Sequence, residues 1–312
     1  MPTWIVSDMD AGIRLDKFLA AQDRVGSRAR AAAALDRGKV FVNDVEVALA
    51  DAGRRLAVGD AVRVWSDRPG SAKRRSTLGD TRDLPIVYED EALIVLNKPP
   101  GVLSVPLPLN RREGGRSVFD DLKHYLRSRS RRRPFVVHRI DRDTSGLVLF
   151  AKTEDAQEIL KAQFKRHLAE RVYLAVVYGK PSPVSGTWRD HLAWDTAALI
   201  QKETSPNDPR GKEAICQYRL VETLKGASLV ELTLVTGRRN QIRIQARLRG
   251  HTLIGERRYI YGPDALRPIN FPRQALHALR LGFTHPDGRP LTLEAPLPED
   301  LRSLIARLRT QG

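Results

Sequence analysis

Residues Val136–Phe150, VVHRIDRDTSGLVLF, join two apolar runs through a segment rich in groups that could do chemistry. Its ionisable side chains are those of His138, Arg139, Asp141, Arg142 and Asp143. Charged groups are costly to bury in a sheet, so a chain that interrupts strands with them is expected to place them in a turn or a cleft. This segment is therefore the first candidate for a functional site.

Three kinds of chemistry fit these residues. The run Asp141–Thr144 after an apolar strand resembles the start of an aspartate-nucleophile phosphatase motif, but the later Lys and acidic pair of that motif have no suitable counterpart. Asp141 and Asp143 could form a glycosidase-like carboxylate pair in a turn, although in a strand they would point to opposite faces. A single carboxylate, Asp141, could act on a sugar or base while nearby cations keep it ionised. A polar turn whose carboxylates accept backbone hydrogen bonds explains the residues equally well.

The whole chain carries a large excess of positive charge. It has 53 Lys and Arg against 37 Asp and Glu, a formal net charge of +16. Each phosphate that Lys or Arg neutralises releases counterions, so this excess favours a polyanionic partner such as RNA. A genome that prefers Arg codons would give the same composition, so charge alone does not establish the partner.

Length and composition restrict the class of protein. A chain of 312 residues with 41% hydrophobic residues is long enough for about two folded domains. Cys216 is the single cysteine, which excludes a disulfide framework and a cysteine-based zinc site within one chain. No apolar stretch has the length of a signal peptide or a membrane helix, so we expect a cytoplasmic protein with no membrane contact, by default a monomer.

Residues 1–66 are expected to form a small α+β domain. The segment RLDKFLAAQ has apolar residues at helical spacing, and Ser27 is a suitable N-cap for the alanine-rich RARAAAALDR, which Gly38 can end. The segments KVFVND and GDAVRVW alternate like short strands.

The second of these helices carries candidate contacts to a nucleic-acid backbone. Arg28, Arg30 and Arg37 lie away from its alanine face, where solvated arginines would look the same. Residues 67–83, DRPGSAKRRSTLGDTRD, combine Pro, Gly, Ser and mixed charge without apolar periodicity, which is typical of a flexible basic linker.

Residues 84–312 are expected to form a larger domain, mostly sheet. Segments such as IVYEDEALIVLNK, GLVLFAK, VYLAVVYG and SLVELTLV are rich in β-branched residues, whereas EDAQEILKAQFKRHL and PEDLRSLIARLRTQ have helical patterns. The run Arg127–Arg133, RSRSRRR, is expected to be a loop that could grip phosphates beside the candidate site.

Five segments in order carry a family resemblance. HRIDRDTSGLVLFAKT resembles the signature of the RluA family of pseudouridine synthases, with Ile140 where Leu is usual. LPIVYEDEALIVLNKPPGVLSVP, RVYLAVVYG, VTGRRNQIRIQARLRGHTLIGERRY and LHALRLGFTHP resemble the other family motifs. Together they extend from Leu84 to Pro286, so the resemblance covers the predicted larger domain.

The resemblance implies an RNA isomerase that converts uridine to pseudouridine without a metal or another cofactor. Asp141 would be the catalytic carboxylate, and Arg243 would pair with it and keep it ionised. Tyr173 would lie against the uracil and is the candidate for removing the proton from the ring carbon. Arg139 would enter the space that the target uridine leaves when it flips out of the stack.

The resemblance also implies the fold and the substrate. The predicted fold class is α+β, with a catalytic domain built on a mixed, mainly antiparallel sheet around a central cleft. Residues 1–66 are similar to a small RNA-binding domain of a ribosomal small-subunit protein, which implies that Arg28, Arg30 and Arg37 contact RNA. Ribosomal RNA of the large subunit is the favoured substrate, and transfer RNA is the alternative.

Three positions depart from the family pattern. Asn240 stands where the third motif usually has His, Gln245 replaces a second usual His, and Glu256 replaces an Asp. Gly237 and Gln241 are retained. We interpret the chain as a divergent enzyme in which the hydrogen bonds around the site differ, the alternative being an RNA-binding protein that keeps the fold without the activity.

The other polar residues near the motifs are interpreted as structural. His138, His277 and His285 lie in strand or turn contexts, and Asp143 is expected to accept hydrogen bonds within its turn. Lys98 of the Asn-Lys-Pro-Pro-Gly turn could contact phosphate or serve the sheet topology.

Overall fold

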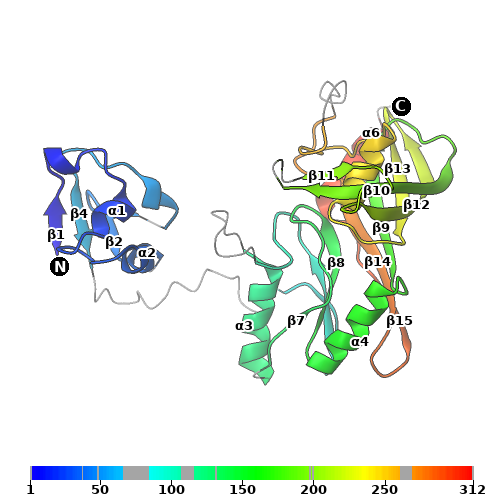
Figure 1. Ribbon diagram of the computed structural model, residues 1–312, viewed down its shortest axis with the longest axis horizontal. Helices are drawn as coiled ribbons and strands as arrows, with labels where there is room; N and C mark the ends of the chain where they lie inside the picture. The colour runs from blue at the N-terminus through cyan, green and yellow to red at the C-terminus, as the bar shows by residue number, and fades with distance from the viewer. Residues whose placement is uncertain are drawn as a thin grey trace. The chain divides into compact units, whose positions relative to one another are not determined.

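The chain divides into two compact units, Met1–Asp80 and Thr81–Gly312 (Figure 1). The computed structural model describes residues 2–310 except for Arg37, Ala48, 66–83, 107–115, Arg131, Ala197, Leu199 and 261–268. The predicted linker 67–83 and the candidate RNA contact Arg37 lie outside the described residues. Within the described residues, no helix has both the length and the apolar character needed to cross a membrane.

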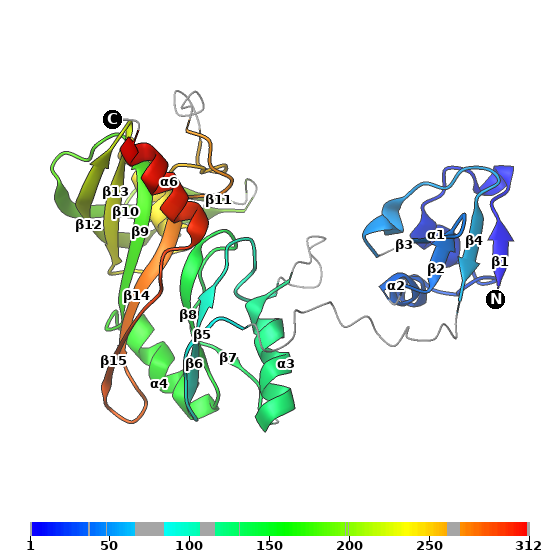
Figure 2. The ribbon, with the colours of Figure 1, turned by 180° about the vertical axis from the view of Figure 1, so that it is seen from behind.

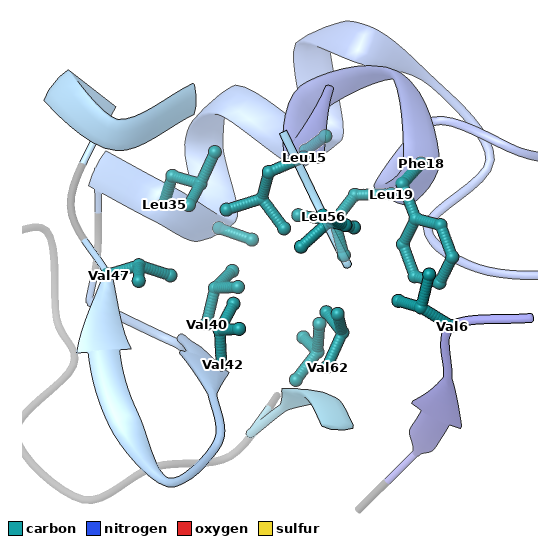
Figure 3. Packing of buried hydrophobic residues seen from close by; sticks show 13 residues of the cluster. Val6, Leu15, Phe18, Leu19, Leu35, Val40, Val42, Val47, Leu56 and Val62 are labelled. Atoms are coloured by element: carbon teal, nitrogen blue, oxygen red, sulfur yellow. The ribbon is translucent and has the colours of Figure 1, made fainter. Parts of the chain in front are cut away.

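The first unit pairs two short helices with a four-stranded antiparallel sheet in the order β1-β4-β2-β3. Its elements are β1 (Thr3–Ile5), α1 (Leu15–Leu19), α2 (Arg28–Asp36), β2 (Val40–Val42), β3 (Val45–Val47) and β4 (Ala61–Val64), with 3-10 turns at Asp8–Asp10 and Leu49–Gly53. Figure 3 shows the core between helices and sheet, where Leu15, Phe18 and Leu19 of α1 share one cluster with Val40 and Val62. The unit therefore has a hydrophobic core of its own.

Local signals in the sequence set the ends of these elements. The Ser27 hydroxyl accepts a hydrogen bond from the backbone N–H of Arg30 (3.2 Å), which confirms the predicted N-cap. Gly38 follows α2 in the left-handed region (φ 61°), as predicted. Asn43 and Asp44 also have positive φ (51° and 63°), the conformation that a tight hairpin between β2 and β3 requires.

The second unit is built on one large sheet. Among the described residues it has eleven strands, in the order β11-β10-β12-β13-β9-β14-β8-β6-β5, with β7 beside β8 and β15 beside β14. The strands are β5 (Ile86–Glu89), β6 (Leu93–Lys98), β7 (Phe135–Val136), β8 (Ser145–Ala151), β9 (Glu170–Tyr178), β10 (Ser185–Asp195), β11 (Ile200–Glu203), β12 (Lys212–Leu224), β13 (Ala227–Leu234), β14 (Leu276–Thr284) and β15 (Pro290–Glu294). Strand β14 pairs with β8 in parallel, whereas the other pairs described are antiparallel. The predicted mixed, mainly antiparallel sheet is confirmed.

Helices cover both faces of this sheet. They are α3 (Val118–Ser130), α4 (Glu154–Lys165), α5 (Gln241–Leu248) and α6 (Glu299–Thr310). Alternate residues of β8 point to opposite faces, so Val148 and Phe150 pack with α3 while Leu147 and Leu149 pack with α4. Helix α6 packs over β9, β12 and β13, as Figure 2 shows from behind.

The basic run Arg127–Arg133 differs from the expectation of a loop. Helix α3 extends to Ser130, so Arg127 and Arg129 lie in its last turn, where cations complement the helix dipole. Arg127, Arg132 and Arg133 line a cavity that shares no residue with the cavities around Asp141. These arginines of the run therefore line a different cavity from those at Asp141, and their contact with phosphates stays a prediction.

Gly146 lets β8 approach β14 closely. Its φ is 109°, and a Cβ atom at this position would lie 2.2 Å from the carbonyl oxygen of Ala278. The parallel pairing of Ala278 with Gly146 therefore requires a residue without a side chain, directly after the turn that carries Asp141.

We expect Gly146→Ala to lower the free energy of unfolding of the second unit by at least about 2 kcal/mol, because the backbone strain and the clash add together. Gly288→Ala is the matched control: its φ is also positive (95°) but its Cβ would meet no atom within 4 Å. The control should cost about 1 kcal/mol in urea unfolding followed by circular dichroism. Equal losses for the two variants would contradict the close approach.

Candidate active site

Asp141 lies in the turn between β7 and β8, and four successive backbone carbonyls of this turn accept hydrogen bonds. The carbonyls of residues 140 to 143 accept, in order, from the Ser104 hydroxyl (2.7 Å), the Thr144 backbone N–H (3.2 Å), the Lys98 ammonium (2.8 Å) and the Arg273 guanidinium (2.9 Å). The Ser104 hydroxyl also accepts from the backbone N–H of Ile140 (3.1 Å). The turn is therefore fixed independently of the Asp141 side chain.

Lys98 is fully buried at the end of β6 and does not face solvent. Its ammonium group donates to the carbonyls of Pro99, Val102 and Arg142, each at 2.8 Å, and so uses all three of its donors. Burial lowers the pKa of Lys98 to about 7, although the charge of Asp143 opposes the shift. Of the two roles left open for Lys98, the structure supports the topological one, because its donors are directed at backbone.

Arg243 links Asp141 to a buried carboxylate. Its Nη1 lies 3.2 Å from Oδ2 of Asp141, while Nε and Nη2 each donate to Glu256 at 2.7 Å. Glu256 is buried and also accepts from the backbone N–H groups of Arg257, Arg258 and Tyr259. Burial opposes the charge of both groups, but the hydrogen bonds between them raise the pKa of Arg243 and lower that of Glu256. Arg243 is therefore a permanent cation beside Asp141.

Asn240 contacts the same carboxylate from the start of α5. Its backbone is left-handed (φ 54°), and its side chain lies between Asp141 and the Tyr259 hydroxyl. With the amide nitrogen directed at Asp141, Asn240 donates to both carboxylate oxygens, at 3.0 and 3.1 Å, and its oxygen accepts from Tyr259 at 3.0 Å. The opposite orientation would place the amide oxygen against a carboxylate, so the hydrogen bonds assign the first.

Tyr173 in β9 is largely buried and lines the same cavity as Asp141 and Arg243. Burial raises the pKa of its hydroxyl to about 12, and the charge of Asp141 adds to the rise. The hydroxyl is therefore neutral at physiological pH. Asp141, Tyr173 and Arg243, which the family resemblance named together, therefore line one cavity.

Two cavities meet at Asp141. The first, of 520 Å³, contains Tyr173 and is lined by the turn before β8 and by parts of β9 and α5. The second, of 350 Å³, is lined by seven arginines, namely Arg139, Arg142, Arg239, Arg243, Arg257, Arg258 and Arg273. Arg139 is exposed and lines both. One side of Asp141 is thus suited to a planar polar ligand and the other to anions.

The histidines near the motifs have structural contacts, as interpreted from the sequence. His138 accepts a hydrogen bond from the backbone N–H of Leu149 (3.0 Å), stacks on Phe164, and has its pKa lowered by burial to about 3. His277 is fully buried between the Ser145 hydroxyl (3.0 Å) and the Ala295 carbonyl (3.1 Å). His285 is buried beside the carboxylates of Asp90 and Asp287, away from Asp141.

Asp143 and Gln245 make contacts other than those that the sequence suggests. The carbonyl of Asp143 takes part in the hydrogen bonds of the turn, whereas among the described residues no hydrogen bond to its carboxylate is found, so the expectation for its side chain is wrong. Gln245 is fully buried and donates to Asp190 (2.7 Å) and to the Ala214 carbonyl (3.0 Å). Of the two usual His positions, only Asn240 is in contact with Asp141.

In the first unit, Arg28 and Arg30 are exposed in the first turn of α2, whose buried residues are Ala31, Ala34 and Leu35. Both side chains are accessible to solvent, but Arg28 is spaced three and seven residues from the buried Ala31 and Leu35 and so lies on the same side of the helix as they do, contrary to its predicted position. Their contact with RNA stays a prediction.

Comparison with known proteins decides the family. The family model described as RNA pseudouridylate synthase matches residues 92–248, which include Asp141, Tyr173, Asn240 and Arg243. The chain belongs to the RNA pseudouridylate synthase family. The predicted activity is thereby confirmed: the protein is an RNA pseudouridine synthase, an isomerase that acts on RNA.

Relatives of this pseudouridine synthase cover almost its whole length. The uncharacterised RNA pseudouridine synthase YlyB of Bacillus subtilis is 37% identical over 96% of this chain and 95% of its own. Ribosomal large subunit pseudouridine synthase D of Zymomonas mobilis is 36% identical over 95% and 94%, and synthase C of Vibrio vulnificus is 31% identical over 96% and 94%. The human RNA pseudouridylate synthase domain-containing protein 4 has the same fold, with a TM-score of 0.60 at 19% identity over 73% of this chain and 95% of that one.

We expect Lys98→Met to destabilise the synthase by about 3 kcal/mol, because three buried carbonyls lose their hydrogen-bond donor. It should also lower kcat, because the Arg142 carbonyl next to Asp141 is no longer held. Lys152→Met is the matched control, a second buried Lys whose partners are Glu89 and the Asp90 carbonyl. Thermal unfolding and activity of the folded fraction would separate the two, since the control should lose stability alone.

Proposed function

We propose that this pseudouridine synthase modifies uridine in ribosomal RNA of the large subunit. Two relatives that match nearly the full chain, at 36% and 31% identity, carry this substrate in their names. The net charge of +16 suits a large polyanion, and the cavity lined by seven arginines adjoins Asp141. Transfer RNA is the alternative substrate that the experiment below distinguishes.

The same proposal assigns a separate role to each of three segments of the chain. Residues 1–66 act as an RNA-binding domain, residues 67–83 as a basic linker, and residues 84–312 as the catalytic domain. Support comes from the separate core of the first unit and from the exposure of Arg28 and Arg30 on its helix α2. Arg37, which lies outside the described residues, belongs to the same proposed set of RNA contacts.

The catalytic roles follow from the residues that share the 520 Å³ cavity. Asp141 acts as the catalytic carboxylate, either by attacking the anomeric carbon or by stabilising its positive charge while it takes a sugar proton. Arg243 pairs with this carboxylate and offsets its negative charge, since it holds a permanent positive charge 3.2 Å from Oδ2. The observation that carries the proposal is the convergence on one cavity of Asp141, Tyr173 and Arg243, which come from the turn before β8, from strand β9 and from helix α5.

The isomerisation conserves all atoms. The bond from the anomeric carbon to N1 of uracil breaks, the detached base rotates within the first cavity, and a bond from the same anomeric carbon to C5 forms. C5 then loses its proton and N1 gains one. Tyr173 lies against the base and takes the C5 proton, while the fold supplies a cleft closed by β9, α5 and the turn of Asp141.

The arginines around Asp141 stabilise RNA in which the target uridine is flipped out of the stack. A flipped uridine costs about a few kcal/mol of stacking, least in a loop. Arg139 is exposed at the junction of the two cavities, where its side chain can replace the base in the stack. The arginines of the second cavity are placed to bind the phosphates next to the flipped nucleotide.

Tritium release tests the substrate and the role of Asp141 together. RNA labelled at C5 of uracil, from cells that lack the gene, is incubated with the wild-type protein and with Asp141→Asn. We expect release from large-subunit ribosomal RNA by the wild type and at least a 1,000-fold slower release, about 4 kcal/mol, by the variant. Release from transfer RNA alone would overturn the substrate, and release by the variant would overturn the role of Asp141.

The pH dependence of the reaction tests Tyr173. Because the pKa of its hydroxyl is raised to about 12, the ionised fraction rises tenfold per pH unit at all lower pH values. If phenolate takes the C5 proton, single-turnover tritium release should speed up between pH 7 and 9 by up to about tenfold per unit. Tyr173→Phe keeps the ring and should release slowly without this slope. A flat profile shared by both proteins would leave Tyr173 only its contact with the base.

A further inference from the structure

We propose that Asn240 and Tyr259 form a positioning pair that aims the carboxylate of Asp141, an inference that rests on the proposed catalytic role of Asp141. The pair is built from the departure at residue 240 and from a tyrosine to which the sequence assigned no role. Neither side chain needs to touch RNA for the pair to act. Its effect would be carried to the substrate by the orientation of the carboxylate.

The contacts of Asp141 show why a second donor matters. Arg243 makes its two short hydrogen bonds, 2.7 Å each, to Glu256, and reaches Asp141 at 3.2 Å with one nitrogen and one carboxylate oxygen. One contact of this length leaves the carboxylate free to rotate about its own axis. The Asn240 amide lies within 3.0 and 3.1 Å of the two carboxylate oxygens and restricts that rotation.

Tyr259 determines which way the Asn240 amide points. Its ring is 1% exposed, and its hydroxyl oxygen accepts a hydrogen bond from the backbone N–H of Gln201 in β11 (3.0 Å). The hydroxyl proton is then available for the amide oxygen of Asn240, which lies 3.0 Å away and can only accept. The amide nitrogen must consequently face Asp141. A fixed strand thus orients the carboxylate through two side chains whose donors and acceptors are all matched.

The backbone at residue 240 restricts what could replace the asparagine. A φ of 54° is adopted readily by Gly and by Asn, Asp and His, and rarely by other residues. Among these four, only Asn and His carry an N–H donor for a carboxylate. The amide of Asn240 does not titrate, so a change of pH does not alter its own capacity to donate to Asp141.

Double-mutant kinetics test the pair. Tyr259→Phe removes the hydroxyl, and Asn240→Gly removes the amide while keeping a residue that accepts positive φ. We expect each single variant to lower kcat roughly 10- to 100-fold with KM changed less than about threefold, because a misdirected group costs rate and not binding. The double variant should be no slower than Asn240→Gly, because Tyr259 acts through Asn240.

Tyr125→Phe is the matched control for Tyr259→Phe. Tyr125 is a buried tyrosine of α3 whose hydroxyl donates to Glu89 (2.8 Å), away from the two cavities at Asp141. Its variant should keep the wild-type kcat. A wild-type kcat in folded Tyr259→Phe, or additive losses in the double variant, would overturn the positioning pair.

A second variant gives a readout that a merely structural asparagine would not. Asn240→Asp has the same shape and tolerates the backbone, but it can donate to Asp141 only when one of the two carboxyls is protonated. Asn240 contacts Asp141 and Tyr259, and Arg243 and Glu256 continue this network. Other charged residues that line the cavities at Asn240 include Arg139, Arg238 and Arg239. We expect kcat of Asn240→Asp, relative to wild type, to rise about tenfold or more as pH falls from 8 to 5.5. A ratio that does not change with pH would contradict the donor role.

Asp141→Asn, measured in the same assay, separates the two possible failures. If it still releases tritium, the proposed role of Asp141 is wrong, and Asn240 and Tyr259 then have no catalytic carboxylate to orient. If it is inactive while Tyr259→Phe and Asn240→Asp behave as wild type, the role of Asp141 stands and the positioning pair alone is wrong. Binding of labelled RNA by each variant confirms that loss of release is not loss of substrate.

Discussion

The hydrogen bonds to the four carbonyls of residues 140 to 143 are the constraint on which the site depends. A polar turn at the end of a buried strand would otherwise leave these groups without partners. Two of the donors come from the ends of the strands that flank β8 in the sheet: Lys98 ends β6, and Arg273 precedes β14. The order of strands in the sheet therefore supplies the anchors of the turn, and Asp141 is placed before any contact of its own side chain is made.

The second requirement is a carboxylate that is charged yet partly withdrawn from water. Arg243 meets it because Glu256 fixes the guanidinium through two hydrogen bonds and three backbone N–H groups in turn fix Glu256. A cation held this way needs no reorganisation when charge develops at the substrate. Removing Glu256 would take away both short hydrogen bonds of the buried Arg243 and leave it only the 3.2 Å contact with Asp141, so the stability of the fold and the electrostatics of the site depend on the same pair.

The sequence predicted the identity of the central residues better than their supports. Asp141, Tyr173 and Arg243 fall in motifs whose order is visible in the chain, and the alternating pattern of segments such as GLVLFAK is sufficient to predict sheet. The supports of the turn come from distant segments, and no local pattern marks Ser104 or Arg273 as partners of its carbonyls. Helix α3 was not predicted for a different reason: the Arg-rich composition of its end suggested a loop, whereas its acidic first turn and basic last turn are the signal of a helix.

The three departures from the family pattern have three separate physical explanations. The amide of Gln245 donates hydrogen bonds to the buried carboxylate of Asp190 and to the Ala214 carbonyl, so its role is to give these buried acceptors a donor. The longer side chain of Glu256 brings its two carboxylate oxygens to Nε and Nη2 of Arg243, one oxygen to each nitrogen. Asn240 alone faces the reacting carboxylate, in a backbone conformation open to few residues. Because amides stand at both usual histidine positions, a change of pH near neutrality alters no charge at either of them. A group near the site whose pKa does lie near neutrality is Lys98, at about 7, which holds the carbonyl of Arg142 next to Asp141.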